Sequence, residues 1–189
     1  MALVTPLAAE QAPLLARPYY AGGDPGPIAA TLAEVPELLE VALPFLGAVL
    51  SPSAIPFRTK EIVILRTSAV LRCRYCVDSH TPVALDSGLT ADQVRALRGE
   101  AGHGIDDAFA DERERALVAW TDAVAGGRGA VDPLIEARVG NVFEAHEIVE
   151  LTLLAATTVL LNRYASALRL PVHAGTIDRL ATEGFERLS

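Results

Sequence analysis

Apolar residues recur every three or four positions along most of the chain, and the alternation typical of a half-buried strand is not found. No Asn-Gly pair lies between two apolar runs, so the sequence gives no signal for a tight β-hairpin. Because a helix repeats about every 3.6 residues and a strand every two, this pattern predicts an all-α fold.

Glycine, proline and capping residues divide the pattern into separate helices. Thr90 with Gln93 has the form of a capping box, and Asp132 followed by Pro133 is a strong start signal because proline suits the first helical turn. The predicted helices cover residues 28–33, 36–50, 57–71, 74–86, 91–98, 111–120, a helix that begins at 133, 144–168 and 175–188.

The predicted domain organisation is an irregular N-terminal arm over residues 1–27 and one all-helical domain over residues 28–189. Gly22, Gly23, Pro25 and Gly26 favour the irregular arm, because such clusters interrupt regular structure. A chain of 189 residues is long enough to bury one good core, and no linker marks a second domain.

The predicted helix 144–168 contains the most apolar stretch, residues 151–161. This stretch is shorter than the roughly 20 residues that a bilayer requires, so we expect a buried helix and no membrane span. It is apolar on nearly every side, which one small domain cannot easily cover, and we therefore expect a homo-oligomer. Asn162 and Arg163 lie deep in this helix, and we interpret them as structural residues at a subunit interface.

Composition and charge narrow the classes of function. Hydrophobic residues make up 51% of the chain, which is typical of a packed globule. The formal net charge of −8 leaves no basic face for nucleic acid. Because the amino terminus has no early basic residue and is interrupted by Pro6, Glu10 and Pro13, we expect no export signal and a cytoplasmic location. A cysteine pair in that reducing compartment is more often catalytic, redox-active or metal-binding than a permanent disulfide.

The two cysteines of the chain, Cys73 and Cys76, stand three positions apart, a coincidence of roughly one in a hundred for random placement. His80 follows Cys76 by four residues, so a helix of about 100° per residue places the three side chains within about 60° of one another. The pair also lies at the predicted start of its helix, where free backbone N–H groups and the helix dipole stabilise a thiolate. The pattern therefore predicts a reactive thiol beside an imidazole.

Glu61 is the candidate for a carboxylate that orients His80 and raises its basicity. It lies on the preceding predicted helix, about 18 Å of axial rise before Cys73, whereas His80 lies about 10 Å after that cysteine. Spacing alone does not bring the two side chains together. The helices would have to cross at an angle, or a water molecule would have to bridge the gap.

The segment from Glu61 to His80, with its Cys-x-x-Cys pair and the histidine four residues later, resembles the alkyl hydroperoxidase D-like branch of the carboxymuconolactone decarboxylase superfamily. The later stretch 147–171 also looks like the second conserved helix of these proteins. The two stretches cover about a quarter of the chain, and the first is the more specific.

The resemblance implies an all-α bundle that assembles into trimers or hexamers and reduces hydroperoxides without a metal or organic cofactor. It implies that Cys76 attacks the peroxide, that Cys73 resolves the sulfenic acid, and that His80 and Glu61 form the proton relay. An external dithiol, or a thioredoxin-like or lipoyl reductant, would restore the pair.

One residue departs from the pattern of this family. The best-known members have a histidine immediately before the second cysteine, where this chain has Tyr75. In addition, the first cysteine of many Cys-x-x-Cys helices is the more exposed and has the lower pKa. We still prefer Cys76 as the attacking thiol, because its four-residue spacing places it directly over the His80 imidazole.

Three other interpretations remain open. The cysteines could be two small buried apolar residues, or the chain could be a cofactor-free decarboxylase of the type that gives the superfamily its name. A non-catalytic, zinc-stapled module would use Cys73, Cys76 and His80, with a fourth ligand from the remaining histidines His103, His146 or His173.

Overall fold

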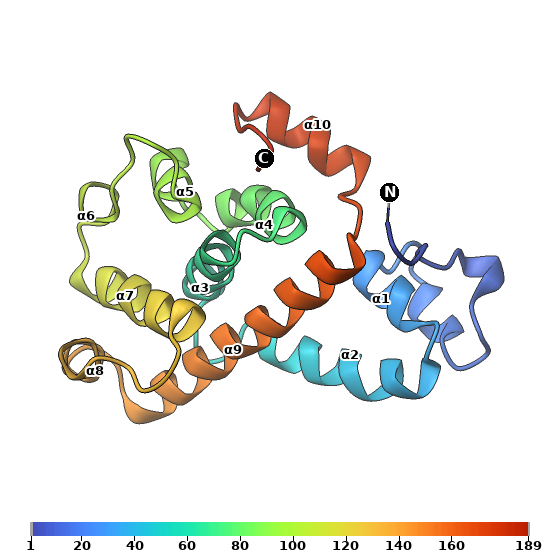
Figure 1. Cartoon of the computed structure of the whole chain (residues 1–189), viewed down its shortest axis with the longest axis horizontal. Coiled ribbons are helices and arrows are strands. Elements are labelled where there is room, and N and C mark those ends of the chain that lie inside the picture. The colour runs from blue at the N-terminus through green and yellow to red at the C-terminus, as the bar shows by residue number, and fades with distance from the viewer. Residues whose placement is uncertain (1, 189) are drawn as a thin grey trace.

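The computed structural model describes residues 2–188, and within that range it contains α-helices and short 3₁₀-helices but no strand (Figure 1). The predicted all-α fold is confirmed. The elements are η1 (Ala9–Gln11), η2 (Arg17–Tyr20), α1 (Pro27–Leu32), α2 (Pro36–Leu50), α3 (Phe57–Val70), α4 (Arg74–Asp86), α5 (Ala91–Arg98), α6 (Ile105–Ala108), α7 (Glu112–Gly126), α8 (Pro133–Gly140), α9 (Ala145–Leu168) and α10 (Ala174–Thr182).

One short helix was not predicted, and two helix ends differ from the sequence prediction by several residues. The four-residue helix α6 was missed because a single turn carries no apolar repeat. Helix α7 continues beyond Trp120 to Gly126. Helix α10 ends at Thr182 instead of 188, because Gly184 adopts a φ of 75° just beyond the helix, in the left-handed region where glycine commonly terminates helices.

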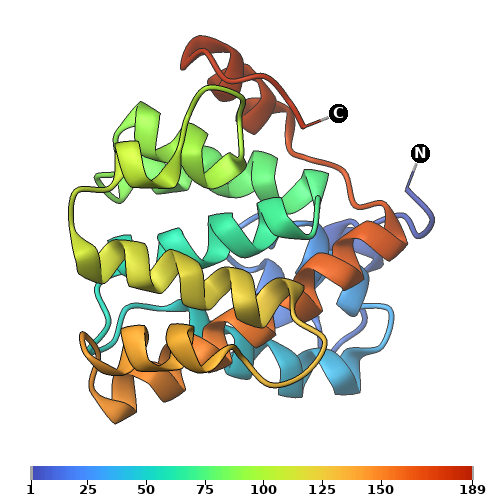
Figure 2. The same ribbon diagram turned by 60° about the vertical axis from the view of Figure 1, so that its left-hand side comes forward.

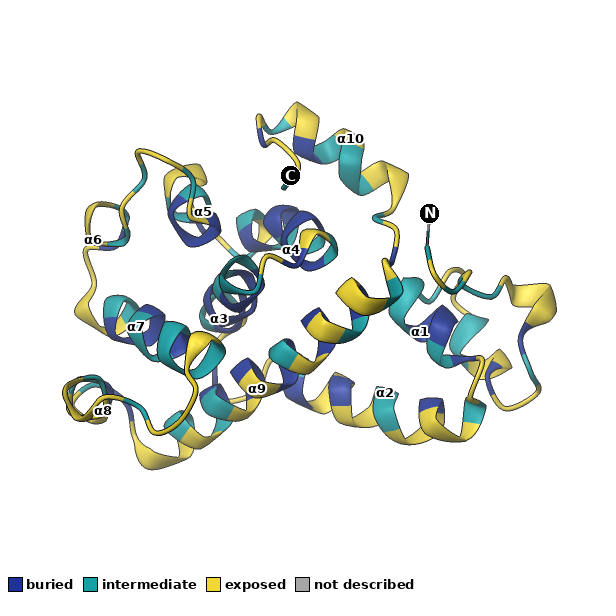
Figure 3. Ribbon diagram, in the orientation of Figure 1, coloured by how far each residue is buried: buried dark blue, intermediate teal, exposed yellow. Residues whose placement is uncertain are grey.

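Helix α3 lies at the centre of the bundle. It packs against α4, α5, α7 and α9, and Figure 2 shows α4, α3 and α7 running side by side. Every residue of α3 from Lys60 to Leu65 is buried, so this helix is enclosed on all sides (Figure 3). A helix that is covered all round offers a fixed frame for the polar residues it carries.

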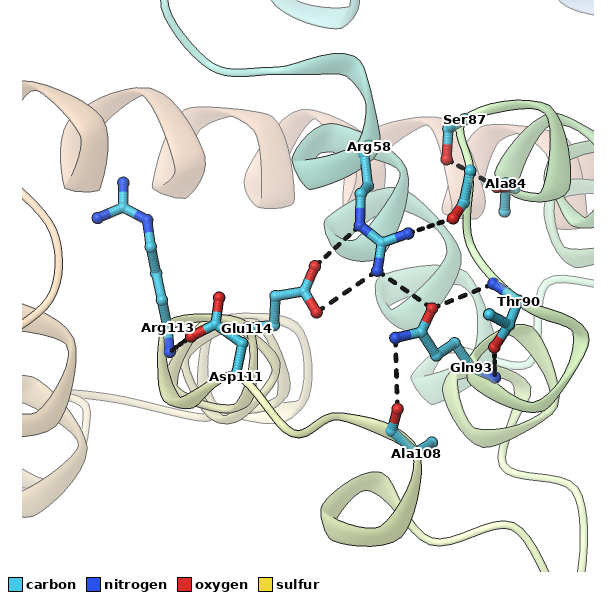
Figure 4. A network of polar contacts seen from close by, with 10 residues as sticks. Arg58, Ala84, Ser87, Thr90, Gln93, Ala108, Asp111, Arg113 and Glu114 are labelled. Atoms are coloured by element: carbon cyan, nitrogen blue, oxygen red, sulfur yellow. Dashed lines mark hydrogen bonds and ion pairs between the residues drawn. The ribbon is translucent and has the colours of Figure 1, made fainter.

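Two basic side chains at the beginning of α3 fix its position. Lys60 is fully buried, and its Nζ lies 2.8 Å from Glu150 on α9 and 2.9 Å from the carbonyl oxygen of Val49 on α2. Arg58 binds Glu114 on α7 and Gln93 on α5 at 2.9 and 3.1 Å (Figure 4). These contacts tie α3 to four neighbouring helices.

The N-terminal segment packs beside α1 and the C-terminal end of α9 (Figure 1). The backbone N–H of Leu3 donates to the carbonyl oxygen of Leu168 at 2.9 Å. A separate cluster of buried apolar residues lies there and consists of Ala12, Ala16, Ala29, Ala33 and Leu39. The division into an arm over 1–27 and a domain over 28–189 stays a prediction.

Helix α9 is longer than the apolar stretch that the sequence singled out. At 24 residues it satisfies, by length and composition alone, the criterion for a membrane-crossing helix. A core helix of a soluble protein satisfies the same criterion, and α9 packs against α2, α3, α4 and α7. Its outer face exposes Val149, Leu153 and Leu160 (Figure 3). The oligomer expected to cover this face stays a prediction.

Asn162 and Arg163, the polar pair that the sequence placed deep in α9, differ in burial. Asn162 is buried, and its Nδ2 donates to the carbonyl oxygen of Thr158 at 2.7 Å and to Ser68 Oγ at 3.3 Å. Arg163 is exposed, so the prediction that both side chains lie deep in the helix is wrong for Arg163. Adjacent positions on a helix point about 100° apart, and α9 is enclosed on one side only.

Candidate functional site

The site is formed where α3 turns into α4. Only residues 71–73 separate the two helices, so α4 folds back along α3 and packs closely against it (Figure 2). Arg72 takes a φ of 53° in this turn. Cys73 caps the amino terminus of α4, and its Sγ accepts the backbone N–H of Cys76 at 3.4 Å. Both cysteines therefore lie at the positive end of a helix dipole, as predicted.

The two sulfur atoms lie 2.7 Å apart and belong to free cysteines. The hydrogen bond with Cys76 lowers the pKa of Cys73 to about 6, although burial opposes the shift; the Ser166 hydroxyl and the Cys76 backbone N–H lower it further. The pKa of Cys76 is raised, first by its hydrogen bond with Cys73 and then by burial. The pair thus holds a thiolate on Cys73 and a proton on Cys76 at neutral pH.

The first cysteine of this Cys-x-x-Cys pair is the less exposed of the two, which is the reverse of the usual order. Cys73 is completely buried, whereas Cys76 is 5% exposed. The expectation that the first cysteine has the lower pKa agrees with the structure, but the expectation that it is the more exposed does not. The cysteine with the lower pKa and the more exposed cysteine are therefore different residues.

His80 and Glu61 are in direct contact, which spacing along the sequence could not decide. Nδ1 of His80 lies 3.0 Å from Oε2 of Glu61, and no bridging water is needed. The Glu61 side chain is only 2% exposed, whereas that of His80 is 31% exposed. The buried carboxylate fixes the orientation of the ring and leaves Nε2 as the nitrogen that can exchange protons.

A small cavity of about 70 Å³ adjoins Cys76. Cys76, His80 and Tyr75 from α4 line it together with Ser68 from α3 and Asn162 from α9. Because the partly exposed His80 belongs to the same wall, the cavity brings Cys76 close to solvent. Cys73 is not among the residues that line it.

Tyr75 occupies the position where the resembling family has a histidine. Burial raises the pKa of Tyr75 to about 12, and the charges of the neighbouring cysteines act in the same direction. The phenol therefore keeps its proton at neutral pH and does not replace a titrating imidazole. His80 with Glu61 is the remaining acid–base pair at the cysteines.

Two serine hydroxyls contact the sulfur atoms and were not singled out from the sequence. The Ser68 hydroxyl lowers the pKa of Cys76 against the stronger effects of Cys73 and burial, and Asn162 holds Ser68 from the other side. Ser166 stabilises the charge on Cys73. No motif identifies these serines, because they come from helices other than the one that carries the cysteines.

The zinc interpretation receives no support from the geometry. Within residues 2–188, no group of three or more His, Cys, Asp or Glu side chains is arranged to hold a metal. The histidines considered as a fourth ligand lie elsewhere: His103 is 3.8 Å from Asp92, His173 caps α10, and His146 lies exposed near the start of α9.

The chain is similar to known proteins in both sequence and fold. The model of the carboxymuconolactone decarboxylase family matches residues 36–123, from α2 into α7. No curated protein matches the chain significantly in sequence. A protein of unknown function from Agrobacterium tumefaciens, suggested to be the antioxidant defence protein AhpD, is 25% identical, with a TM-score of 0.65 over 75% of this chain and 96% of that one.

Two further solved structures share the fold at lower identity. An alkylhydroperoxidase AhpD core, described as an uncharacterised peroxidase-related protein from Ralstonia eutropha JMP134, is 16% identical, with a TM-score of 0.78 over 93% of this chain and 94% of that one. The debrominase Bmp8, solved as a cysteine-to-alanine variant in complex with 2,3,4-tribromopyrrole, is 20% identical, with a TM-score of 0.75 over 96% of this chain and 97% of that one.

The family and these neighbours indicate an enzyme with a peroxidase-related or decarboxylase-type role. The all-helical fold, the family match across α2 to α7 and the AhpD-like neighbours agree with the resemblance carried by residues 61–80. The family match and the AhpD-like neighbours therefore support the similarity of this chain to the alkyl hydroperoxidase D-like branch of the carboxymuconolactone decarboxylase superfamily.

Proposed function

We propose that the protein is a thiol-dependent peroxidase in which Cys73 and Cys76 alternate between dithiol and disulfide. The observation that carries this proposal is the small cavity that Cys76 shares with His80, next to the Cys73 thiolate. The proposal includes a hydroperoxide substrate, an external dithiol, thioredoxin-like or lipoyl reductant, a homo-oligomer such as a trimer or hexamer, and a cytoplasmic location.

The first step uses the proton that the two sulfur atoms share. When a peroxide enters the cavity, the Cys76 proton passes across the 2.7 Å contact to Cys73, and the Cys76 thiolate attacks the terminal peroxide oxygen. The O–O bond breaks and Cys76 becomes a sulfenic acid. His80, held by Glu61, gives a proton to the departing alkoxide or hydroxide, so that an alcohol or water leaves.

The second step closes the disulfide. The Cys73 thiol attacks the sulfur of the Cys76 sulfenic acid, and hydroxide departs with the Cys73 proton as water. The peroxide has then gained two electrons, both taken from the cysteine pair. An external dithiol returns two electrons and two protons and is itself oxidised to a disulfide.

The size of the cavity favours a small substrate. A volume of about 70 Å³ is less than half of the roughly 150 Å³ of an engineered protein cavity that binds benzene. Hydrogen peroxide or a short alkyl hydroperoxide would fit, whereas a lactone acid or a brominated pyrrole would not. The cofactor-free decarboxylase remains the alternative, and turnover of a carboxymuconolactone by a chain that lacks both thiols would favour it.

The test is to locate the sulfenic acid. After one equivalent of hydrogen peroxide, Cys73→Ser is expected to accumulate a sulfenic acid on Cys76, detected by mass spectrometry after trapping with dimedone. Cys76→Ser should form none and should lose dithiol-dependent peroxide consumption. If Cys76→Ser forms a dimedone adduct on Cys73 as fast as the wild-type protein consumes peroxide, Cys76 is not the attacking thiol.

A further inference from the structure

A second and larger depression lies next to residues that adjoin the cysteine pair. It has a volume of about 550 Å³, and we call it the arginine groove because Arg72, Arg74, Arg169 and Arg187 all line it. Its remaining wall includes Tyr75 and Ser166, and it contains no acidic residue. A groove of this size is within the usual range of small-molecule sites.

The charge of the arginine groove is largely uncompensated. Within residues 2–188, Arg72, Arg74 and Arg169 form no ion pair, whereas most other arginines of the chain do. Arg187 pairs with Asp78 through its Nε. In a chain with a net charge of −8, four guanidinium groups around one depression mark a local site for an anion.

The backbone is strained on both sides of the groove. Arg72 and Arg169 have φ values of 53°, and within residues 2–188 they are the only residues other than glycine with positive φ. Arg72 follows the end of α3 and Arg169 caps the end of α9, positions where glycine would be free of this cost. Strained backbone held in two arginines at one site points to a functional reason for these side chains.

Neither cysteine lines the arginine groove, but Tyr75 and Ser166 connect its wall with the cysteine pair. Ser166 lines the groove and stabilises the Cys73 thiolate. Tyr75 lines both the groove and the small cavity, so it separates the two depressions. Cys76 thus lines a small cavity, whereas Ser166, which acts on Cys73, lines a larger depression surrounded by arginines.

We propose that the arginine groove binds the anionic group of a small-molecule dithiol that reduces the Cys73–Cys76 disulfide. This inference rests on the proposed peroxidase cycle and names the chemistry of its reductant: a dithiol that carries a carboxylate. The carboxylate binds the guanidinium groups of Arg72, Arg74 and Arg169. The dithiol gives two electrons and two protons to the protein disulfide and becomes a disulfide itself.

The kinetic test compares two reductants that share one dithiol and differ in charge. Dihydrolipoate carries a carboxylate, and dihydrolipoamide carries a neutral amide in its place. We expect the KM for dihydrolipoate to be about tenfold lower, because charge-assisted contacts of about 1.4 kcal/mol correspond to that factor. In the triple variant Arg72→Gln, Arg74→Gln, Arg169→Gln the ratio of the two KM values should fall to about one.

The matched control is Arg163→Gln. Arg163 on α9 is also exposed and forms no ion pair with any residue that the structure describes, but it does not line the groove. This control should keep the wild-type KM ratio. Equal KM values for the two reductants in the wild-type protein, or the same change in the control as in the triple variant, would overturn the proposal.

A binding measurement separates this inference from the proposed function. Octanoate and octanamide have the same chain and no thiol, and their binding to the reduced protein is measured by calorimetry. Octanoate should bind at least several-fold more tightly, and the triple variant should lose that preference, whether or not the protein consumes peroxide. If the wild-type protein binds both equally, the arginine groove is not an anion site, even if peroxidase activity is found.

Discussion

The low pKa of Cys73 should leave most of this thiol ionised at neutral pH. A thiol with a pKa of about 6, compared with an ordinary value of 9.0, is about 90% ionised at pH 7 instead of ~1%. Because the pKa of Cys76 is raised, one thiolate and not two should form as the pH increases from 4 to 9. Ultraviolet thiolate absorbance measures this directly and does not require a reagent to reach a buried sulfur.

The hydrogen bond from Cys76 is the largest cause of the low pKa of Cys73, so its removal should have the largest effect. In Cys76→Ala that bond is lost while burial remains, so the midpoint of the single titration should move from about 6 towards 9 or above. Cys76→Ser is the matched control, because its hydroxyl still donates to Cys73 and should retain part of the shift.

The other groups that lower the pKa of Cys73 should shift its titration midpoint by smaller amounts when they are removed. Ser166→Ala removes a weaker hydrogen bond and should raise the midpoint less than Cys76→Ala does. The charge of His80 contributes least, so His80→Asn should change the midpoint least. Two thiolates that titrate together near pH 9 in the wild-type protein would contradict the low pKa of Cys73, and equal midpoints in the wild type and Cys76→Ala would contradict its assigned cause.

Two further predictions concern the buried polar pairs of α3. His80→Asn is expected to lower peroxide turnover by about 10²–10⁴-fold. Glu61→Gln should lower it by less, because Glu61 acts only by orienting the ring. Steady-state rates measured over a range of pH check this, and a loss of the same size at every pH would contradict an acid–base role of the pair. Lys60→Ala leaves Glu150 and two backbone carbonyls without their buried partner. The free energy of unfolding, measured by chemical denaturation, should therefore fall by about 3–5 kcal/mol. A decrease below about 1 kcal/mol would contradict the importance of this contact.

The sequence alone determined most of the local structure. Apolar periodicity and the capping signals at Thr90 and Asp132 identified nearly all helices, because these signals act within a few neighbouring residues. The Cys-x-x-Cys spacing and the helix start at Cys73 identified the thiols for the same reason. The missed turn α6 and the early end of α10 show where short elements and a single glycine decide the outcome.

The assembly of the site depends on how the helices pack against one another. The short turn at residues 71–73 folds α4 back along α3, and this packing brings Glu61 within 3.0 Å of His80, although 19 positions separate them in the chain. Ser68 and Ser166 reach the two sulfur atoms from α3 and α9. The arginine groove likewise joins the ends of α3 and α9 with the C-terminal segment. Such contacts depend on how helices pack, which local spacing along the chain does not specify.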